Sequence, residues 1–330
     1  TKIIESARSI GVVKPDKTKI LYSFLGASLV LSLIIVFIRT MFFSRIESVV
    51  ELKAHTTLPI LGEILFSKAG KSSYIVVEAD PKSPITESFR SMRTNLEYMA
   101  ANSTSKIVVI TSNNPGEGKT FCSINLASIL AKAGKRVLIV ELDLHKPKVH
   151  LGLNMKSELG VSNILIGKES IKNTVLKTSV DNLDAILAGP TPPNASELIL
   201  SQHMLELLDY GRANYDYVVI DTPPVGLISD AFILMKYADI NLFVINVRMA
   251  TKGSVNNAHE IVELNKLTNF GFVLNGVREK KSKYYYNRYS YGYGFGYGYG
   301  YGYGYGRGYG YGGYYGYGQK KKKDSDDKKS

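Results

Sequence analysis

The chain has 330 residues, 45% of them hydrophobic, and its 41 lysines and arginines exceed its 29 aspartates and glutamates, so the net charge is +12 at pH 7. This composition excludes a collagen-like, a disulfide-stapled and a wholly disordered chain, and the length allows about two domains. The single cysteine, Cys122, cannot form an intramolecular disulfide, which suits a reducing compartment.

The first predicted element is a transmembrane helix over residues 20–43. The 19 residues from Ile20 to Ile38 carry no charge and include few polar side chains. At about 1.5 Å per residue, such a helix nearly crosses the roughly 30 Å hydrocarbon core of a bilayer. Apolar residues cover every face of it, which favours a lipid-exposed helix over an amphipathic one. Basic residues flank both ends, so charge alone leaves the orientation open.

Residues 44–103 are predicted to be a juxtamembrane connector that leads into a helix. Prolines punctuate the connector, and helical periodicity begins near Glu87. Apolar side chains recur at helical spacing up to Met99, namely Phe89, Met92 and Leu96.

Residues 104–280 are predicted to form an α/β domain with a parallel sheet covered by helices on both faces. Short, continuously apolar runs occupy residues 106–111, 136–142, 216–220 and 241–247. Helical patterns around 121–133 and 197–212 separate them. Strands that are apolar on both faces and alternate with helices are typical of a parallel sheet.

A phosphate-binding loop follows the first of these strands. Residues 113–120 match the pattern GxxxxGK[ST], except that Asn113 replaces the first glycine. In such a loop main-chain N–H groups and the helix N-terminus hold phosphate, the lysine neutralises charge and the hydroxyl binds Mg²⁺. We therefore expect ATP and Mg²⁺ as cofactors. The predicted nucleotide-binding residues in this segment are Pro115, Gly116, Glu117, Gly118, Lys119, Thr120 and Phe121.

Two further strands end at acidic residues. Glu141 and Asp143 follow the second strand, and Asp221 ends the third. Ligands of open parallel sheets bind beyond the carboxyl ends of the strands, so these acids point toward the phosphate loop. We predict catalytic roles for Lys119, Glu141, Asp143 and Asp221, and metal ligation by Thr120, Asp143 and Asp221. Which of Glu141 and Asp143 is the base stays open.

The phosphate loop, the acid-x-acid strand end and the Asp-Thr-Pro-Pro strand end together resemble the bacterial tyrosine kinases. These Wzc-like proteins are polysaccharide co-polymerases and autokinases, and the resemblance covers essentially the whole chain. It implies a P-loop NTPase-like fold and an ATP-dependent protein-tyrosine kinase that regulates capsular or exopolysaccharide polymerisation and export. It also implies that residues 1–19 are the extracytoplasmic end of a missing upstream domain, and that the kinase and tail lie in the cytoplasm, below the bacterial inner membrane.

The same resemblance implies partners and further site residues. Glu87, Arg90 and Arg93 match the subunit-contact motif of the family, which implies a homo-oligomeric ring. The other implied partners are the membrane, the polysaccharide export and polymerisation machinery and a protein-tyrosine phosphatase, and no nucleic acid is expected. Asn275 occupies a position where related P-loop ATPases often contact adenine.

The chain departs from the usual Asp-x-Asp-x-Arg pattern of this family. Glu141 replaces the first aspartate and is one methylene longer. His145 replaces the arginine and lacks its permanent positive charge. These departures predict modest activity.

Residues 281–330 are predicted to be a disordered, tyrosine-rich tail. Between residues 278 and 330 there are 12 basic and 4 acidic residues, a net charge of +8. Glycine alternates with tyrosine and no aliphatic side chain is present between 284 and 318, so the segment lacks a core. A mobile chain tethered to an ATP site is a substrate at high effective concentration. The predicted phospho-acceptors are Tyr284, Tyr285, Tyr286, Tyr289, Tyr291, Tyr293, Tyr297, Tyr299, Tyr301, Tyr303, Tyr305, Tyr309, Tyr311, Tyr314, Tyr315 and Tyr317.

Two other functions remain open at the level of sequence. A partition-type ATPase would use nucleotide to switch its assembly without phosphorylating protein. A membrane-tethered scaffold or nucleic-acid-binding protein would use the aromatic tail for stacking or adhesion.

Overall fold

The computed structural model describes residues 17–42, 45–66, 74–99, 105–226 and 230–278. The chain divides into two units, residues 1–281 and residues 282–330. Since the described residues end at 278, the predicted tail and its tyrosines lie outside them, as do residues 1–16.

An eight-stranded sheet organises the described part of the first unit, with the strand order β1-β8-β7-β2-β6-β3-β5-β4. Every neighbouring pair is parallel except β4 and β5, which are antiparallel. The strands are β1 (Ile60–Leu65), β2 (Lys106–Ser112), β3 (Val137–Glu141), β4 (Leu176–Lys177), β5 (Leu183–Ile186), β6 (Tyr217–Asp221), β7 (Ile240–Asn246) and β8 (Phe270–Val277).

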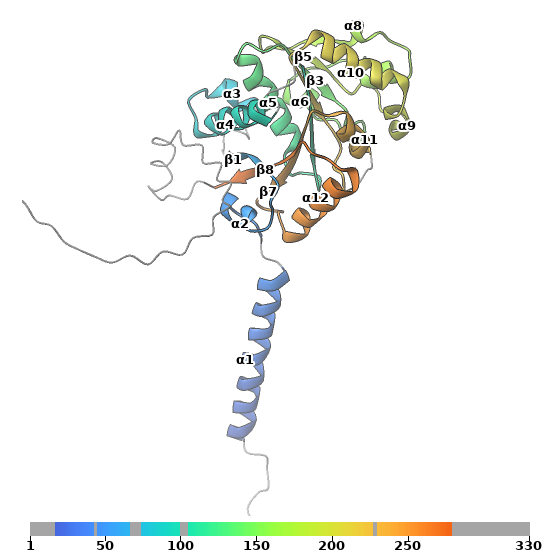
Figure 1. Cartoon of the computed structure of the whole chain (residues 1–330). Helices are drawn as coiled ribbons and strands as arrows, with labels where there is room; N and C mark the ends of the chain where they lie inside the picture. The colour runs from blue at the N-terminus through green and yellow to red at the C-terminus, as the bar shows by residue number, and fades with distance from the viewer. Residues whose placement is uncertain (1–16, 43–44, 67–73, 100–104, 227–229, 279–330) are drawn as a thin grey trace, which may run out of the picture. The chain divides into compact units, whose positions relative to one another are not determined.

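Helices cover both faces of this sheet (Figure 1). The helices α3 (Val76–Ala79), α4 (Pro84–Met99), α5 (Lys119–Lys132) and α6 (Val149–Gly152) pack on one face. The other face carries α2 (Val49–Lys53), α7 (Val161–Leu165), α9 (Ala195–Ile199), α10 (Gln202–Asn214), α11 (Asp230–Tyr237) and α12 (Lys252–Asn265). The short α8 (Ile171–Thr174) follows α7. The predicted fold class is confirmed.

Alternation along the strands divides the core between the two faces. In β2, the side chains of Ile107 and Val109 pack into one cluster, and those of Val108 and Ile110 into the other. Successive side chains of a strand point to opposite faces, so a strand buried on both faces must be apolar throughout. This is the physical reason why the continuously apolar runs of the sequence form strands.

The described residues of the predicted connector, 45–66 and 74–99, contribute a strand to the sheet and side chains to the core. Its strand β1 pairs in parallel with β8, and Ile60 lies opposite Phe272. Phe89, Met92 and Leu96 of α4 are fully buried. The sequence suggested a connector because β1 is short and isolated between prolines, whereas its partner strand lies some 200 residues later in the chain.

Other elements differ in detail from the sequence prediction. The pattern over 197–212 contains two helices, α9 and α10, which Leu200 and Ser201 separate. The strands β4 and β5 were missed. β5 has only four residues, and Asp184 interrupts its apolar pattern. The burial of the Asp184 carboxylate is compensated, because Tyr215 Oη donates to it at 2.8 Å and Lys177 Nζ lies 2.9 Å away.

The helix α1 (Lys17–Phe42) covers residues 20–42 of the predicted membrane span 20–43, and residue 43 lies outside the described residues. Residues 17–39 have a mean hydropathy of 2.5 over the most apolar window, and none of that window is buried against protein. By length and composition, α1 can cross a membrane.

The position of α4 in the core leads to a stability prediction. Phe89→Ala removes a fully buried ring and is expected to lower the free energy of unfolding by about 3 to 5 kcal/mol. Ser91→Ala, on the exposed side of the same helix, is expected to change it by less than about 0.5 kcal/mol. Urea unfolding of the whole chain in detergent micelles, followed by circular dichroism, measures both values. Equal stability of the two variants would show that α4 is not a core helix.

Candidate active site

The phosphate loop joins the end of β2 to the start of α5. Gly116 and Gly118 have positive φ angles of 87° and 95°, a region that favours glycine. A Cβ atom on Gly118 would lie 2.1 Å from Nδ2 of Asn275, so a side chain there would displace the Asn275 amide. The following helix directs its unpaired N–H groups and positive dipole end toward the loop.

Three hydrogen bonds hold the phosphate loop in place, two through its backbone and one through the side chain of Asn113. Nδ2 of Asn275, near the end of β8, donates to the carbonyl oxygen of Glu117 at 2.9 Å. Nδ2 of Asn257, on α12, donates to Oδ1 of Asn113 at 2.5 Å. The backbone nitrogen of Gly226 donates to the carbonyl oxygen of Asn113 at 3.1 Å. Asn113, which replaces the usual glycine, thus ties the loop to α12. The expected adenine contact of Asn275 stays a prediction.

Lys119 and Asp143 form a buried ion pair at the carboxyl edge of the sheet. Nζ of Lys119 lies 3.0 Å from Oδ2 of Asp143, and both side chains are at most 11% exposed. Oδ1 of Asp143 accepts a second hydrogen bond from the backbone nitrogen of Lys146 at 3.1 Å. The structure therefore places the predicted phosphate-loop lysine and one predicted acid in direct contact.

Asp221 lies beside the hydroxyl groups of α5. Oγ1 of Thr120 donates to its Oδ2 at 2.7 Å, and Oγ of Ser123 donates to its Oδ1 at 3.0 Å. The carboxyl is completely buried, and burial raises the pKa of Asp221 to about 6, although Lys119 and the Thr120 hydroxyl oppose the rise. Ser123 was missed from the sequence. Its signal was its position one helical turn after Thr120, on the same face of α5.

The oxygen atoms of Thr120 and Asp221 fit a magnesium ion. Mg²⁺ prefers hard oxygen ligands and usually binds through one or two protein side chains together with waters and phosphate oxygens. A hydroxyl and a carboxylate in hydrogen-bond contact match this donor set, and the ion would replace the hydroxyl proton as the partner of the carboxylate. Asp143, the third predicted ligand, pairs with Lys119 in the structure, and its metal-binding role stays a prediction.

Glu141 lies at the end of β3, as predicted, and its carboxylate accepts hydrogen bonds from three backbone nitrogens, while its role as a base stays a prediction. Oε1 accepts hydrogen bonds of 2.5 Å from the backbone nitrogens of Lys148 and Val149, and Oε2 accepts one of 3.2 Å from that of Ala188. The residue is fully buried, and burial raises the pKa of Glu141 against the effect of these hydrogen bonds. Glu141 therefore joins the loops after β3 and β5, and the longer side chain of glutamate provides the reach.

The remaining predicted residues have these surroundings. Phe121 is partly buried, and its ring lies edge-on to Phe89 with a centroid distance of 5.8 Å. Pro115 and His145 are exposed.

On α4, Arg90 pairs with Glu87, which precedes it by one turn, and Arg90 NH2 donates to the carbonyl oxygen of Pro81 at 2.8 Å. Arg93 follows on α4 and is partly exposed. The subunit-contact role of these three residues stays a prediction.

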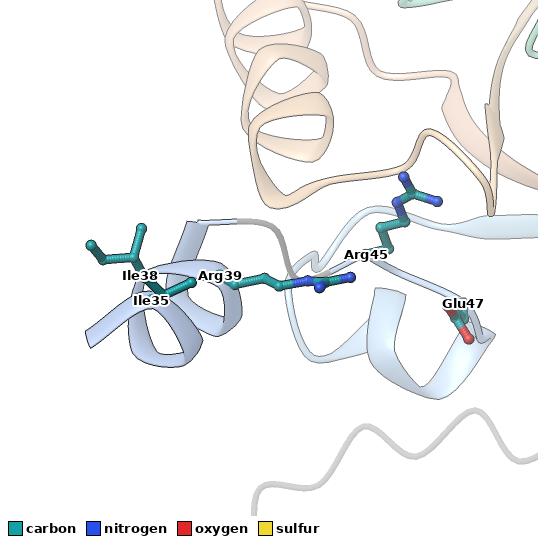
Figure 2. Close-up of a pocket in the computed structure, with 5 residues that line it drawn as sticks. All are labelled: Ile35, Ile38, Arg39, Arg45 and Glu47. Carbon is teal, nitrogen blue, oxygen red and sulfur yellow. The ribbon is translucent and has the colours of Figure 1, made fainter. Parts of the chain in front are cut away.

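A separate hollow lies near the end of α1. Figure 2 shows its lining side chains, Ile35, Ile38, Arg39, Arg45 and Glu47. None of them was predicted from the sequence to bind phosphate or metal. The candidate active site is therefore the cluster of Lys119, Thr120, Asp143 and Asp221 at the edge of the sheet.

Comparison with known proteins assigns the family. Residues 105–272 match a family model described as an AAA domain. Over 213 residues the chain is 37% identical to tyrosine-protein kinase YwqD of Bacillus subtilis (strain 168). This alignment covers 64% of this chain and 90% of that protein. The chain belongs to the bacterial tyrosine-protein kinases. The family expected from the sequence motifs is thus confirmed.

Other members of this tyrosine-kinase family match a longer part of the chain or superpose on its structure. Tyrosine-protein kinase wzc of Salmonella typhimurium (strain LT2) is 31% identical over 288 residues, which cover 83% of this chain but only 40% of that protein. The kinase domain of Escherichia coli tyrosine kinase ETK superposes with a TM-score of 0.66 at 29% identity, covering 73% of this chain and 97% of that one. The nucleotide-binding fold and the kinase class predicted from the sequence are both supported.

Burial of Glu117 within the phosphate loop leads to a prediction about pH. Its Oε2 accepts a hydrogen bond of 2.7 Å from the Asn114 nitrogen, but burial raises the pKa of Glu117 to about 7 from the ordinary 4.5. The folded chain therefore keeps a proton that the unfolded chain loses. The resulting stabilisation is complete below about pH 4.5 and is lost as the pH rises through 7.

Glu117→Gln removes this titration. We expect it to flatten the fall in the free energy of unfolding of the nucleotide-free chain between pH 5 and pH 8, by up to about 3 kcal/mol. Urea unfolding at several pH values measures the slope, and the exposed Glu158→Gln is the matched control. An unchanged slope in Glu117→Gln would contradict the protonated state of this carboxyl.

Proposed function

We propose that the chain is an ATP-dependent tyrosine autokinase that transfers the γ-phosphate of ATP to tail tyrosines of neighbouring copies. The observation that carries this proposal is the contact of Asp143 with Lys119 beside the Thr120 and Asp221 pair. This arrangement unites a phosphate-binding cation, an oxygen site for Mg²⁺ and a carboxylate that can accept a proton. The tail supplies 16 of the 23 tyrosines of the chain.

The residues of the chain would divide the reaction as follows. The phosphate-loop N–H groups and Lys119 bind and orient the β- and γ-phosphates. A Mg²⁺ ion, held by Thr120 and Asp221, would neutralise charge on the phosphate oxygens. Asp143 accepts the phenol proton as the tyrosine oxygen bonds to the γ-phosphorus and ADP leaves. Burial of Lys119 and Asp143 strengthens these charge interactions, because water screens them little.

We further propose that α1 anchors the kinase in the bacterial inner membrane, with the domain and the tail in the cytoplasm. The unburied surface of α1, uncharged from residue 20 to residue 38, and the availability of ATP in the cytoplasm support this placement. The match to wzc supports a role in capsular or exopolysaccharide polymerisation and export, in a ring assembled through Glu87, Arg90 and Arg93. A protein-tyrosine phosphatase would reverse the modification.

Labelled ATP tests the transfer directly. The whole chain in detergent micelles is expected to acquire label on tail tyrosines, and Lys119→Met is expected to lose it, because the γ-phosphate is no longer held. Lys135→Met, beyond the other end of α5, is the matched control. Mass spectrometry maps the label, and ATP hydrolysis without labelled tyrosine would favour a partition-type ATPase.

A mixing experiment tests transfer between copies. A Lys119→Met chain with an intact tail is combined with an active chain that ends at residue 280. Label on the tail of the inactive chain is expected only if a neighbouring copy phosphorylates it. An unlabelled tail in the mixture, with a labelled tail in the active full chain, would mean that each copy modifies itself.

A comparison of two acids identifies the base. Asp143→Asn is expected to lower kcat by roughly 10²- to 10⁴-fold, because the amide cannot accept the phenol proton. Glu141→Gln keeps one acceptor oxygen but loses the other, so we expect a loss of about 1 to 3 kcal/mol in unfolding free energy with a much smaller change in kcat. Steady-state kinetics and thermal unfolding separate the two effects. The opposite kinetic order, in a folded Glu141→Gln chain, would assign the base to Glu141.

A further inference from the structure

The loop between β3 and α6, together with the first turn of α6, presents a group of basic side chains next to the candidate active site. His145, Lys146 and Lys148 are exposed, and the side chain of His150 is 33% exposed. We call these four residues the basic rim. Within the described part of the chain, the side chains of Lys146 and Lys148 make no ion pair or hydrogen bond. Their positive charges are therefore available to a ligand.

The two acids of the strand end hold the backbone of this loop in place. Asp143 accepts from the nitrogen of Lys146, and Glu141 accepts from the nitrogens of Lys148 and Val149. Val149 is fully buried in the core. The loop is thus fixed at several points, although its basic side chains are exposed. Since fewer degrees of freedom are lost when a ligand binds, a fixed basic loop is a better anion site than mobile surface lysines.

The carboxylate of Asp143 links the basic rim to the phosphate-loop lysine. Asp143 contacts Nζ of Lys119 at 3.0 Å through one oxygen and the nitrogen of Lys146 at 3.1 Å through the other. A tyrosine positioned for transfer at Asp143 would therefore bring its neighbouring residues over the rim. The rim can contact the substrate chain beside the reacting tyrosine.

The charge of the tail decides which substrate fits. Residues 278–330 have a net charge of +8 before modification, so the rim repels the unmodified tail. Each phosphate adds about −1.5 to −2. Between Tyr297 and Tyr305 every second residue is tyrosine, so in an extended chain adjacent tyrosines lie about 7 Å apart. A phosphate already on one tyrosine thus lies close to the next acceptor and has the charge that the rim attracts.

We propose that the basic rim is a phosphotyrosine-binding site, which makes a tail already phosphorylated on one tyrosine a better substrate than the unmodified tail. This inference rests on the proposed kinase function and specifies its preferred substrate. Its consequence is that phosphorylation of one tail proceeds in clusters, because each phosphate recruits the chain for transfer to the adjacent tyrosine.

Two synthetic peptides test the proposal with the whole chain in detergent micelles. Both have the sequence of residues 297–305, and one has phosphotyrosine at the position of Tyr301. We expect a kcat/KM on the order of 5-fold higher for the phosphorylated peptide, mainly through KM, as partly exposed charge contacts provide. The ratio is expected to fall toward one in high salt, which screens these contacts.

Charge variants locate the effect. The double variant Lys146→Gln with Lys148→Gln is expected to bring the ratio to about one and to leave the KM for ATP unchanged. The double variant Lys132→Gln with Lys135→Gln makes the same charge change at the other end of α5 and is expected to keep the preference. Thermal unfolding confirms that both variants are folded.

Each remaining outcome has a definite meaning. Equal kcat/KM values for the two peptides in the unmodified chain overturn the proposal, and so does a preference that survives in the Lys146 and Lys148 variant. If the unmodified chain labels neither peptide nor its own tail, the proposed kinase function itself fails. If it labels its own tail and both peptides equally, the kinase function holds and only the phosphotyrosine site is rejected.

Discussion

The buried contact between Lys119 and Asp143 is the interaction on which the site depends. Two opposite charges removed from water are stable only when each is paired and hydrogen-bonded. Here Asp143 pairs with the lysine through one oxygen and accepts the nitrogen of Lys146 through the other. If the phosphates of ATP take over Lys119, they compensate its charge and release one oxygen of Asp143. Under the proposed function, binding of the nucleotide would thus prepare the base that the reaction needs.

The other buried acids have distinct structural uses at the same edge of the sheet. Glu117 accepts a backbone nitrogen within the phosphate loop, and Glu141 joins the loops that follow β3 and β5. Asp221 pairs with the hydroxyls of α5. Burial raises the pKa of all three acids. Without these hydrogen bonds, burying the carboxyl groups would cost considerable free energy. Acids that look equivalent in the sequence therefore separate into those that hold loops in place and those that, under the proposed function, would face the nucleotide.

The segment next to α1 contributes directly to the sheet that carries the site. β1 pairs with β8, and in this pairing Ile64 lies opposite Asn275. Asn275 in turn holds the carbonyl oxygen of Glu117 in the phosphate loop. The strand that follows the predicted membrane helix thus pairs with β8, and β8 in turn holds the loop that would bind phosphate. This arrangement explains why the kinase domain extends well before the phosphate loop.

Local patterns in the sequence determined the parallel sheet, the phosphate loop, the acids at the strand ends and the membrane-length helix, because each depends on neighbouring residues. Only the tertiary structure decided what these groups contact. Asn257 lies 144 residues from its partner Asn113, and Ala188 lies 47 residues from Glu141. A hydrogen bond between distant segments leaves no periodicity in the chain. For the same reason, the sequence could propose both Glu141 and Asp143 as the base, whereas their partners in space show that Glu141 is used by two loops and Asp143 faces Lys119.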